Sequence, residues 1–238
     1  MYSVAWASEK EKERTVETKK LAGRYAADLV ESGWDLGLGT GSTVFYALER
    51  LSERIHAGSL KVRGIPTSVD TERKCQELGI PIIGFTDVTH LDMCIDGADE
   101  VDAGKRLIKG GGGALVREKI VAAASKEMVI IVGENKVVDR LGVEFLLPVE
   151  VIPFAVPPVI QRLEALECQP YVRTGNDGEP MLSDNGNRIL DCRFEGIDDP
   201  VNLEIAINMI PGVIDNGLFC GLAGRIIVGL ESGEVEVR

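Results

Sequence analysis

The chain has 238 residues, of which 45% are hydrophobic and 27% are charged. This composition is typical of a globular protein that buries a full core without disulfide bonds or a structural metal. The formal net charge of −12 argues against proteins that bind nucleic acid mainly by neutralising its phosphates. An anionic small molecule is still compatible with this charge, because local basic side chains and backbone N–H groups act at short range.

The cysteines and histidines argue against disulfide and zinc chemistry. The five cysteines are far apart and form no C-x-x-C pair, and His56 and His90 have no H-E-x-x-H spacing. No apolar run approaches the roughly 20 residues of a membrane span, and the N-terminal segment lacks the pattern of a signal peptide. We therefore expect a cytoplasmic protein with reduced thiols that binds neither nucleic acid nor membrane.

The first part of the chain alternates helical and strand patterns. An amphipathic segment with a period near 3.6 residues is followed by short apolar runs and further amphipathic segments. The pattern predicts helices at 11–31, 44–56, 69–78 and 114–124, and strands at 34–39, 60–65, 80–85, 92–95, 106–108 and 128–132. Strands that alternate with helices indicate a doubly wound, mostly parallel α/β sheet.

A different pattern begins after Pro148. It predicts strands at 149–152, 169–173, 188–192 and 213–219, and helices at 156–166 and 199–208. The order βαββαβ is that of a ferredoxin-like α+β domain. A last apolar strand at 223–230 can return to the first sheet. We therefore predict a larger domain of residues 1–145 and 220–238 and a small domain of residues 146–219.

Polar and glycine-rich segments follow several of the predicted strands. They are residues 40–43, 67–68, 96–99 and 109–113. In parallel sheets, ligands bind at the carboxyl ends of the strands. We therefore expect these four segments to lie together at one edge of the sheet.

The first of these segments belongs to a glycine-rich turn, GLGTGST at 37–43. It is not a dinucleotide fingerprint, because Ser42 occupies the place of the third glycine, and it lacks the Gly-Lys-Ser/Thr of a Walker loop. The N–H groups at a helix N-terminus bind phosphate, and we predict such a site at Thr40, Gly41, Ser42 and Thr43. Alternatively, Ser42 or Thr43 only caps the helix.

The second segment, DGADE at 96–100, holds Asp96 and Asp99 three residues apart. Gly97 permits a tight turn that brings the two carboxylates together. Like charges held close raise the pKa of one of them, which suits a general acid near neutral pH. A magnesium site and an ordinary surface turn are the alternatives.

The third segment places Lys109 before four glycines at 110–113, and Glu118 lies about one turn into the next helix. A glycine run suits a backbone that comes very close to a ligand. A lysine beside it can stabilise a developing oxyanion. Glu118 can face the same ligand, or it can be a surface residue paired with a nearby Lys or Arg.

Three other lysines are candidates for ligand contacts. Lys136 follows the strand at 128–132, and either Lys19 or Lys20 can reach a phosphate from the first helix. A phosphate site, paired carboxylates, a lysine and a candidate glutamate base together fit proton transfer next to a carbonyl of a phosphorylated substrate. This chemistry needs no cofactor, and we expect none.

These motifs resemble the type A family of ribose-5-phosphate isomerases. The matching segments are GLGTGST at 37–43, DGADE at 96–100, KGGGGA at 109–114, REK at 117–119, LPVEVIP at 147–153, DNGN at 184–187 and INMIPGVIDNGLF at 207–219. The resemblance implies a Rossmann-like domain with a smaller α/β domain. It also implies interconversion of ribose 5-phosphate and ribulose 5-phosphate through an enediol, without a required metal, in the pentose phosphate pathway.

The resemblance implies roles for individual residues. Glu118 would move the proton between C2 and C1, and Lys109 would stabilise the enediolate. Asp96 and Asp99 would bind hydroxyls and assist ring opening and oxygen protonation. The other residues expected to bind the substrate are Thr40, Gly41, Ser42, Thr43, Gly97, Ala98, Gly110, Gly111, Gly112 and Lys136. Family members are homodimers or homotetramers, and we expect the same here.

Two other functions fit a related fold. The first is a sugar-phosphate sensor without catalysis, which the retained Glu118 and Lys109 and the acidic net charge argue against. The second is a coenzyme A transferase, whose glutamate would form a covalent acyl adduct that we do not expect.

Overall fold

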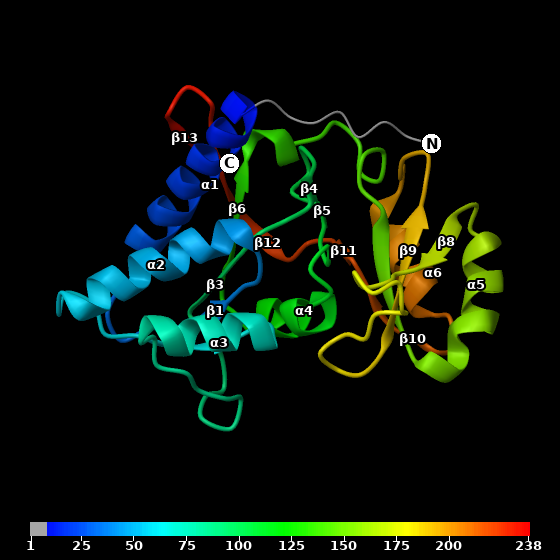
Figure 1. Ribbon diagram of the computed structural model, residues 1–238, viewed down its shortest axis with the longest axis horizontal. Helices are drawn as coiled ribbons and strands as arrows, with labels where there is room; N and C mark the ends of the chain where they lie inside the picture. Colours follow the sequence, from blue (N-terminus) through cyan, green and yellow to red (C-terminus); the bar gives the residue numbers. More distant parts are fainter. Residues whose placement is uncertain (1–8) are drawn as a thin grey trace.

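The computed structural model describes residues 9–238. Within these residues the largest sheet has six strands in the order β13-β12-β6-β3-β1-β2 (Figure 1). Every neighbouring pair is parallel except β12 and β13, which confirms the predicted parallel sheet. The strands are β1 Asp35–Leu38, β2 Arg63–Pro66, β3 Met93–Asp96, β6 Met128–Gly133, β12 Ala223–Gly229 and β13 Val235–Val237.

Helices cover both faces of this sheet, as Figure 1 shows. They are α1 Glu9–Asp28, α2 Ser42–His56 and α3 Val69–Leu78 on one face and α4 Leu115–Ala123 on the other. Alternate side chains of β6 enter different cores: Val129 and Ile131 pack with α1 and α2, whereas Ile130 and Val132 pack with Val121 of α4. This alternation explains why β6 is apolar throughout.

The second sheet is antiparallel, with the order β10-β7-β9-β8. Its strands are β7 Leu147–Val151, β8 Gln169–Val172, β9 Arg188–Arg193 and β10 Val213–Asn216, and its helices are α5 Val156–Glu164 and α6 Pro200–Asn208. Two short 3-10 helices complete the chain, η1 Glu134–Lys136 and η2 Pro153–Ala155. The chain order βαββαβ and the antiparallel sheet confirm the ferredoxin-like prediction.

A third, small sheet lies between the other two. It consists of β4 Glu100–Val101, β5 Leu107–Ile108 and β11 Leu218–Phe219, in the order β11-β5-β4 (Figure 1). The strand predicted at 213–219 is therefore two strands in different sheets, and Gly217 separates them. A Cβ on Gly217 would lie 2.3 Å from the carbonyl oxygen of Lys109, so only glycine lets the two backbones approach this closely.

Other differences from the predicted elements are local. The strand predicted at 80–85 is reduced to a single bridge between Gly64 and Ile82. Pro81 cannot donate a ladder hydrogen bond and Gly84 weakens a strand, which accounts for the difference. The short strands β4 and β13 were not predicted. Across residues 9–238, no helix is long and apolar enough to cross a membrane.

Candidate active site

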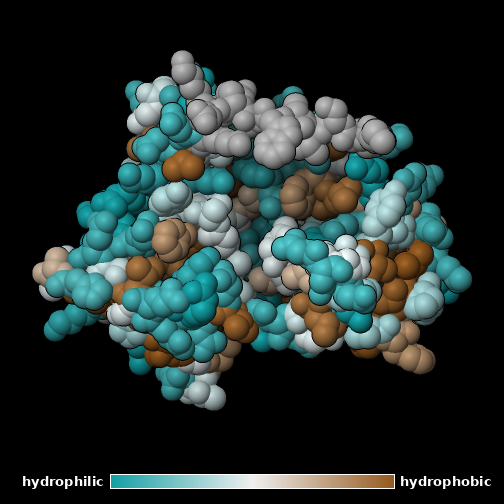
Figure 2. Space-filling model, in the orientation of Figure 1, coloured by the Kyte–Doolittle hydropathy of each residue, from teal (hydrophilic) through white to brown (hydrophobic). Residues whose placement is uncertain are grey.

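A cavity of about 190 Å³ lies where β1, β3, β5 and β6 end. The face drawn in Figure 2 is hollowed near its centre, between the helices beside the large sheet and the four-stranded sheet. The cavity is lined by Lys19, Thr40, Gly41, Ser42, Thr43, Gly97, Ala98, Asp99, Lys109, Gly110, Gly111, Gly112, Glu118 and Lys136. The structure thus brings together every predicted site residue except Asp96, which lies behind the cavity wall.

The wall at the start of α2 presents backbone donors. Gly41 is the N-cap residue with φ 117°, and none of the described side chains caps the helix. The alternative that Ser42 or Thr43 caps α2 is therefore wrong. Within the described chain, Ser42 Oγ accepts a hydrogen bond from Lys19 Nζ at 3.0 Å instead. An uncapped helix N-terminus with a positive dipole end suits an anion.

Two lysines flank this helix end. Lys19 and Lys136 both line the cavity, whereas Lys20 is exposed and does not. Burial lowers the pKa of Lys19, and the nearby ammonium of Lys136 lowers it further. Two ammonium groups that repel each other beside a helix N-terminus favour the binding of an anion, which would relieve the repulsion. Of the two candidate lysines of the first helix, only Lys19 therefore lies at the cavity.

Lys109 lies between two buried carboxylates. Its Nζ is 3.1 Å from Asp96 Oδ2 and 3.4 Å from Glu118 Oε1, and it donates to the Gly97 carbonyl. All three charged side chains are almost completely buried. Burial alone would lower the pKa of Lys109, but the carboxylates of Asp96 and Glu118 outweigh it and raise that pKa. Lys109 therefore remains an ammonium at neutral pH.

Glu118 has the properties expected of a general base. Burial raises its pKa to about 8; the charges of Asp96 and Asp99 raise it as well, against the opposing effect of Lys109. Its Oε2 has no hydrogen-bond partner among residues 9–238. Glu118 enters the site because α4 begins directly after the glycines and buries this side of its first turn. The alternative of a solvent-facing ion pair is therefore wrong.

Asp96 occupies a different place from Asp99. It is the last residue of β3, and its Oδ1 accepts the N–H groups of Thr40 at 3.0 Å and Gly97 at 2.8 Å. A Cβ on Gly39 would lie 2.2 Å from this oxygen, so the neighbouring strand end must be glycine. Burial raises the pKa of Asp96, while Lys109 opposes this. Asp96 is fully buried and does not line the cavity, so its expected direct contact with a ligand has no exposed surface in this structure.

The glycine loop at 110–113 forms the wall opposite α2. Gly110 and Gly113 have φ angles of 98° and 81°, a region that favours glycine. The N–H of Gly111 donates to Asp99 Oδ2 at 2.8 Å, and a Cβ on Gly111 would lie 2.7 Å from the other oxygen of this carboxylate. Asp99 and the glycine loop are thus in direct contact at the cavity.

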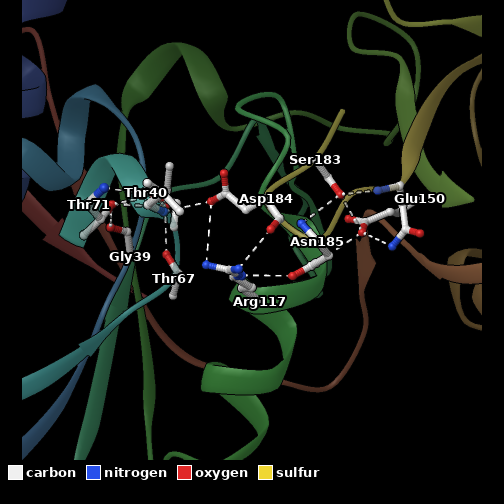
Figure 3. A network of polar contacts seen from close by, with 12 residues as sticks. Gly39, Thr40, Thr67, Thr71, Arg117, Glu150, Ser183, Asp184 and Asn185 are labelled. Carbon is white, nitrogen blue, oxygen red and sulfur yellow. Dashed lines mark hydrogen bonds and ion pairs between the residues drawn. The ribbon is translucent and has the colours of Figure 1, made fainter. Parts of the chain in front are cut away.

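Hydroxyl groups hold Thr40 from behind. Its Oγ1 lies 2.8 Å from both Thr67 Oγ1 and Ser68 Oγ, and these two residues are buried. Thr71 Oγ1 lies 3.2 Å from the same atom and donates to the Gly39 carbonyl (Figure 3). Thr67 and Ser68 therefore support the ligand-binding edge, as their place after β2 suggested, but they do not line the cavity.

The turn at 183–187, between β8 and β9 of the four-stranded sheet, contacts the start of α3. Asp184 Oδ2 accepts the N–H of Val69, the first residue of α3, at 2.8 Å. Arg117 of α4 donates to the Asp184 carbonyl at 3.0 Å. The turn is anchored at its other end because Ser183 donates to the fully buried Glu150 at 2.8 Å (Figure 3). The DNGN segment, one of the segments that resemble the family, thus links β7 to the helices beside the site.

The arrangement can perform proton transfer next to a carbonyl. A carboxylate base with a raised pKa lies beside a permanent ammonium, and backbone donors and two lysines lie at the other end of the cavity. Among the side chains that the structure describes, those of residues 13–238, no group of three or more His, Cys, Asp or Glu is arranged to hold a metal ion.

The chain was compared with known proteins. A profile of the family Ribose 5-phosphate isomerase A (phosphoriboisomerase A) matches residues 63–233. Ribose-5-phosphate isomerase A of Trichodesmium erythraeum is 46% identical over 231 residues, which are 96% of this chain and 98% of that protein. Ribose-5-phosphate isomerase A 1 of Oceanobacillus iheyensis is 51% identical over 211 residues, which are 89% and 93% of the two chains.

Solved structures agree in fold. Ribose 5-phosphate isomerase A from Methanocaldococcus jannaschii has a TM-score of 0.88 and 39% identity, with 92% of this chain and 97% of that chain covered. A D-ribose-5-phosphate isomerase in complex with phospho-erythronic acid has a TM-score of 0.91 and 39% identity, with 95% and 98% covered. The chain therefore belongs to the ribose 5-phosphate isomerase A family.

Proposed function

We propose that this protein interconverts ribose 5-phosphate and ribulose 5-phosphate, with Glu118 as the base. Family membership supports the reaction, and one solved relative binds phospho-erythronic acid, a phosphorylated sugar acid. The observation that carries the assignment is the buried Glu118 beside the Lys109 ammonium in a cavity with a second, cationic end. This cavity matches a small substrate with a reactive carbonyl at one end and a phosphate at the other.

The reaction moves one proton between two carbons. The Glu118 carboxylate removes the proton from C2 of the open-chain aldose, and the electrons of the C1 carbonyl shift to O1, giving an enediolate. The almost completely buried Lys109 ammonium stabilises this charge. Glu118 then returns the proton to C1, while the proton on O2 moves to O1, which leaves a ketone at C2 and a hydroxyl at C1.

The two aspartates have different roles in this proposal. Asp99 lines the cavity and can carry the proton between O2 and O1. Asp96 lies behind it with its Oδ2 3.1 Å from Lys109 Nζ, so we assign it to holding the ammonium in place rather than to contact with substrate. Gly97, Ala98 and the glycine loop surround the sugar hydroxyls.

The phosphate occupies the cationic end. The N–H groups at the start of α2, the hydroxyls of Ser42 and Thr43 and the ammonium groups of Lys19 and Lys136 converge there. This end of the cavity combines a helix N-terminus with positive side chains, the usual chemistry of phosphate binding.

A direct assay tests the function. The purified chain should convert ribose 5-phosphate to ribulose 5-phosphate, and arabinose 5-phosphate, the C2 epimer, should bind mainly as an inhibitor. Binding of ribose 5-phosphate without turnover would instead support the sensor alternative, which no contact in the site favours. Mass spectrometry after incubation with an acyl-coenzyme A should find no covalent adduct.

We further propose that the protein is a cytoplasmic homodimer or homotetramer whose subunits meet at the small domain, taken as residues 146–219. An apolar stripe of Val201, Ile205 and Met209 is exposed along α6, and Met209 is 76% exposed. Exposed apolar stripes on a folded domain are typical of subunit contacts. Light scattering should give an oligomer for the wild type and a smaller mass for Ile205→Glu. Val16→Glu, at an exposed apolar position of α1, is the control that should leave the mass unchanged.

A further inference from the structure

Arg173, just after β8 in the four-stranded sheet, contacts the glycine loop of the cavity. Its guanidinium is fixed at one side by Asp191 of β9: Nε donates to Oδ2 at 2.8 Å and Nη2 donates to Oδ1 at 2.5 Å. Both side chains are largely buried, with 13% and 18% of their surface exposed. A paired, planar guanidinium in this setting is a rigid group, because two parallel hydrogen bonds determine its orientation.

The free edge of this guanidinium binds backbone carbonyls. Arg173 Nη1 donates to the carbonyl oxygens of Gly110 at 2.9 Å and Gly111 at 3.0 Å. The Gly110 carbonyl also accepts the N–H of Gly113 at 2.9 Å. One side chain next to the four-stranded sheet therefore binds two successive carbonyl groups of the cavity wall.

This contact has a consequence for the opposite side of the loop. When successive carbonyls point toward Arg173, the intervening N–H groups are directed elsewhere, and the Gly111 N–H binds Asp99 at 2.8 Å. The Gly111 carbonyl shares a planar peptide unit with the Gly112 N–H, so its contact with Arg173 directs this N–H away from the guanidinium. The Gly112 N–H has no hydrogen-bond partner within the described part of the chain, and Gly112 lines the cavity, so this donor is available to substrate oxygens.

A glycine loop does not hold such an arrangement by itself. Glycine has the largest backbone entropy to lose, and a loop with several of them has many accessible conformations. Donors that stabilise a developing charge must already be oriented before the reaction. We infer that Arg173 is a positioning residue for the isomerisation: by binding the Gly110 and Gly111 carbonyls it orients the loop N–H donors and Asp99 toward the enediolate. The inference rests on the proposed function.

The experiment compares variants with a matched control. Arg173→Met removes the carbonyl contacts and keeps the length of the side chain, and Arg173→Lys keeps the charge but cannot bind Asp191 and two carbonyls at once. Arg188 of β9 is the control, because its Nη1 also binds two carbonyls, those of Pro180 and Met181, in the same hairpin but away from the cavity. Wild-type turnover of ribose 5-phosphate is measured first and tests the proposed function separately.

The expected result is a loss in kcat. Arg173→Met and Arg173→Lys should lower kcat about 10- to 100-fold while KM changes much less, because the affected donors act mainly on the transition state. Both Arg173 substitutions should also weaken inhibition by phospho-erythronic acid and leave inhibition by inorganic phosphate unchanged. A general loss of structure would weaken inhibition by both compounds. Arg188→Met should retain the wild-type values.

Two outcomes would overturn the inference. One is a kcat near that of the wild type in both Arg173 variants; the other is an equal loss in Arg188→Met. If Arg173→Met does not fold, Arg173→Lys decides between the same results. An inactive wild-type protein would contradict the proposed function instead.

Discussion

Lys109 Nζ lies 3.4 Å from Glu118 Oε1, and both side chains are buried. The pair does not neutralise the site, because Asp96 adds a second carboxylate 3.1 Å from the same ammonium. Two carboxylates and one ammonium out of water favour keeping a proton on the carboxyl groups. Lys109 lowers the pKa of Glu118, but burial and the charge of Asp96 raise it by more, so Glu118 keeps a raised proton affinity.

This relationship predicts the pH dependence of catalysis. The base must be ionised to remove a proton, and burial raises the pKa of Glu118 to about 8. For free enzyme, kcat/KM should therefore rise with pH through an apparent pKa near 8, far above the usual range of a carboxyl group. A pH–rate profile with ribose 5-phosphate measures it. A profile that is flat from pH 6 to 9, when chemistry limits the rate, would contradict the burial argument.

The same pKa has an effect on stability with a defined sign. Folded Glu118 binds its proton more tightly than the unfolded chain, whose carboxyl pKa is near 4.5. Its contribution to stability is present below this unfolded value and is lost as pH rises toward about 8. Glu118→Gln cannot ionise, so its free energy of unfolding relative to the wild type should increase over this range. Urea unfolding at several pH values measures the difference, and a constant difference would contradict the sign.

Substitution of two neighbouring lysines tests the phosphate end. Lys19→Met removes an ammonium that lines the cavity, and we expect KM for ribose 5-phosphate to rise about 10- to 100-fold, since a charged hydrogen bond to phosphate is lost. Lys20→Met, at the exposed neighbouring position, is the matched control and should change KM little. Equal effects of the two substitutions would place the phosphate elsewhere. Steady-state kinetics at one ionic strength decides the matter.

Chelation tests whether the reaction depends on a metal. The Lys109 ammonium supplies the positive charge that the enediolate needs, so activity should be unchanged after dialysis against EDTA. Activity that is lost and then restored by Mg²⁺ or Mn²⁺ would favour a metal-assisted hydride shift.

Much of the site could be predicted because it depends on a general property of parallel sheets. Thr40, Asp99 and Lys136 follow strands whose carboxyl ends share one edge, so the strand order was enough to bring them together. Glu118 required more, since an isolated glutamate on a helix resembles any surface residue. Its position one turn after the glycines is a second, independent reason to place Glu118 in the site.

The remaining features depend on packing that no local pattern records. The DGADE motif presents two similar aspartates, but β3 continues to Asp96 and buries it, while Asp99 follows the turn. Lys19 lies on the side of α1 that contacts Ser42 of α2, whereas the neighbouring Lys20 is exposed. Arg173 was missed because its partners at 110–111 lie about 60 residues earlier in the chain, in a loop outside the four-stranded sheet. To predict the role of Arg173 from the sequence, one would need to know how the four-stranded sheet packs against the glycine loop.

The turnover of Glu118→Gln tests the central claim most directly. The amide keeps the size of the side chain but cannot accept the C2 proton, so kcat should fall about 10³-fold or more. Binding of ribose 5-phosphate, measured by calorimetry, should stay close to that of the wild type, because the phosphate end is untouched. A Glu118→Gln protein that isomerises ribose 5-phosphate at a rate near that of the wild type would contradict the assignment of Glu118 as the base.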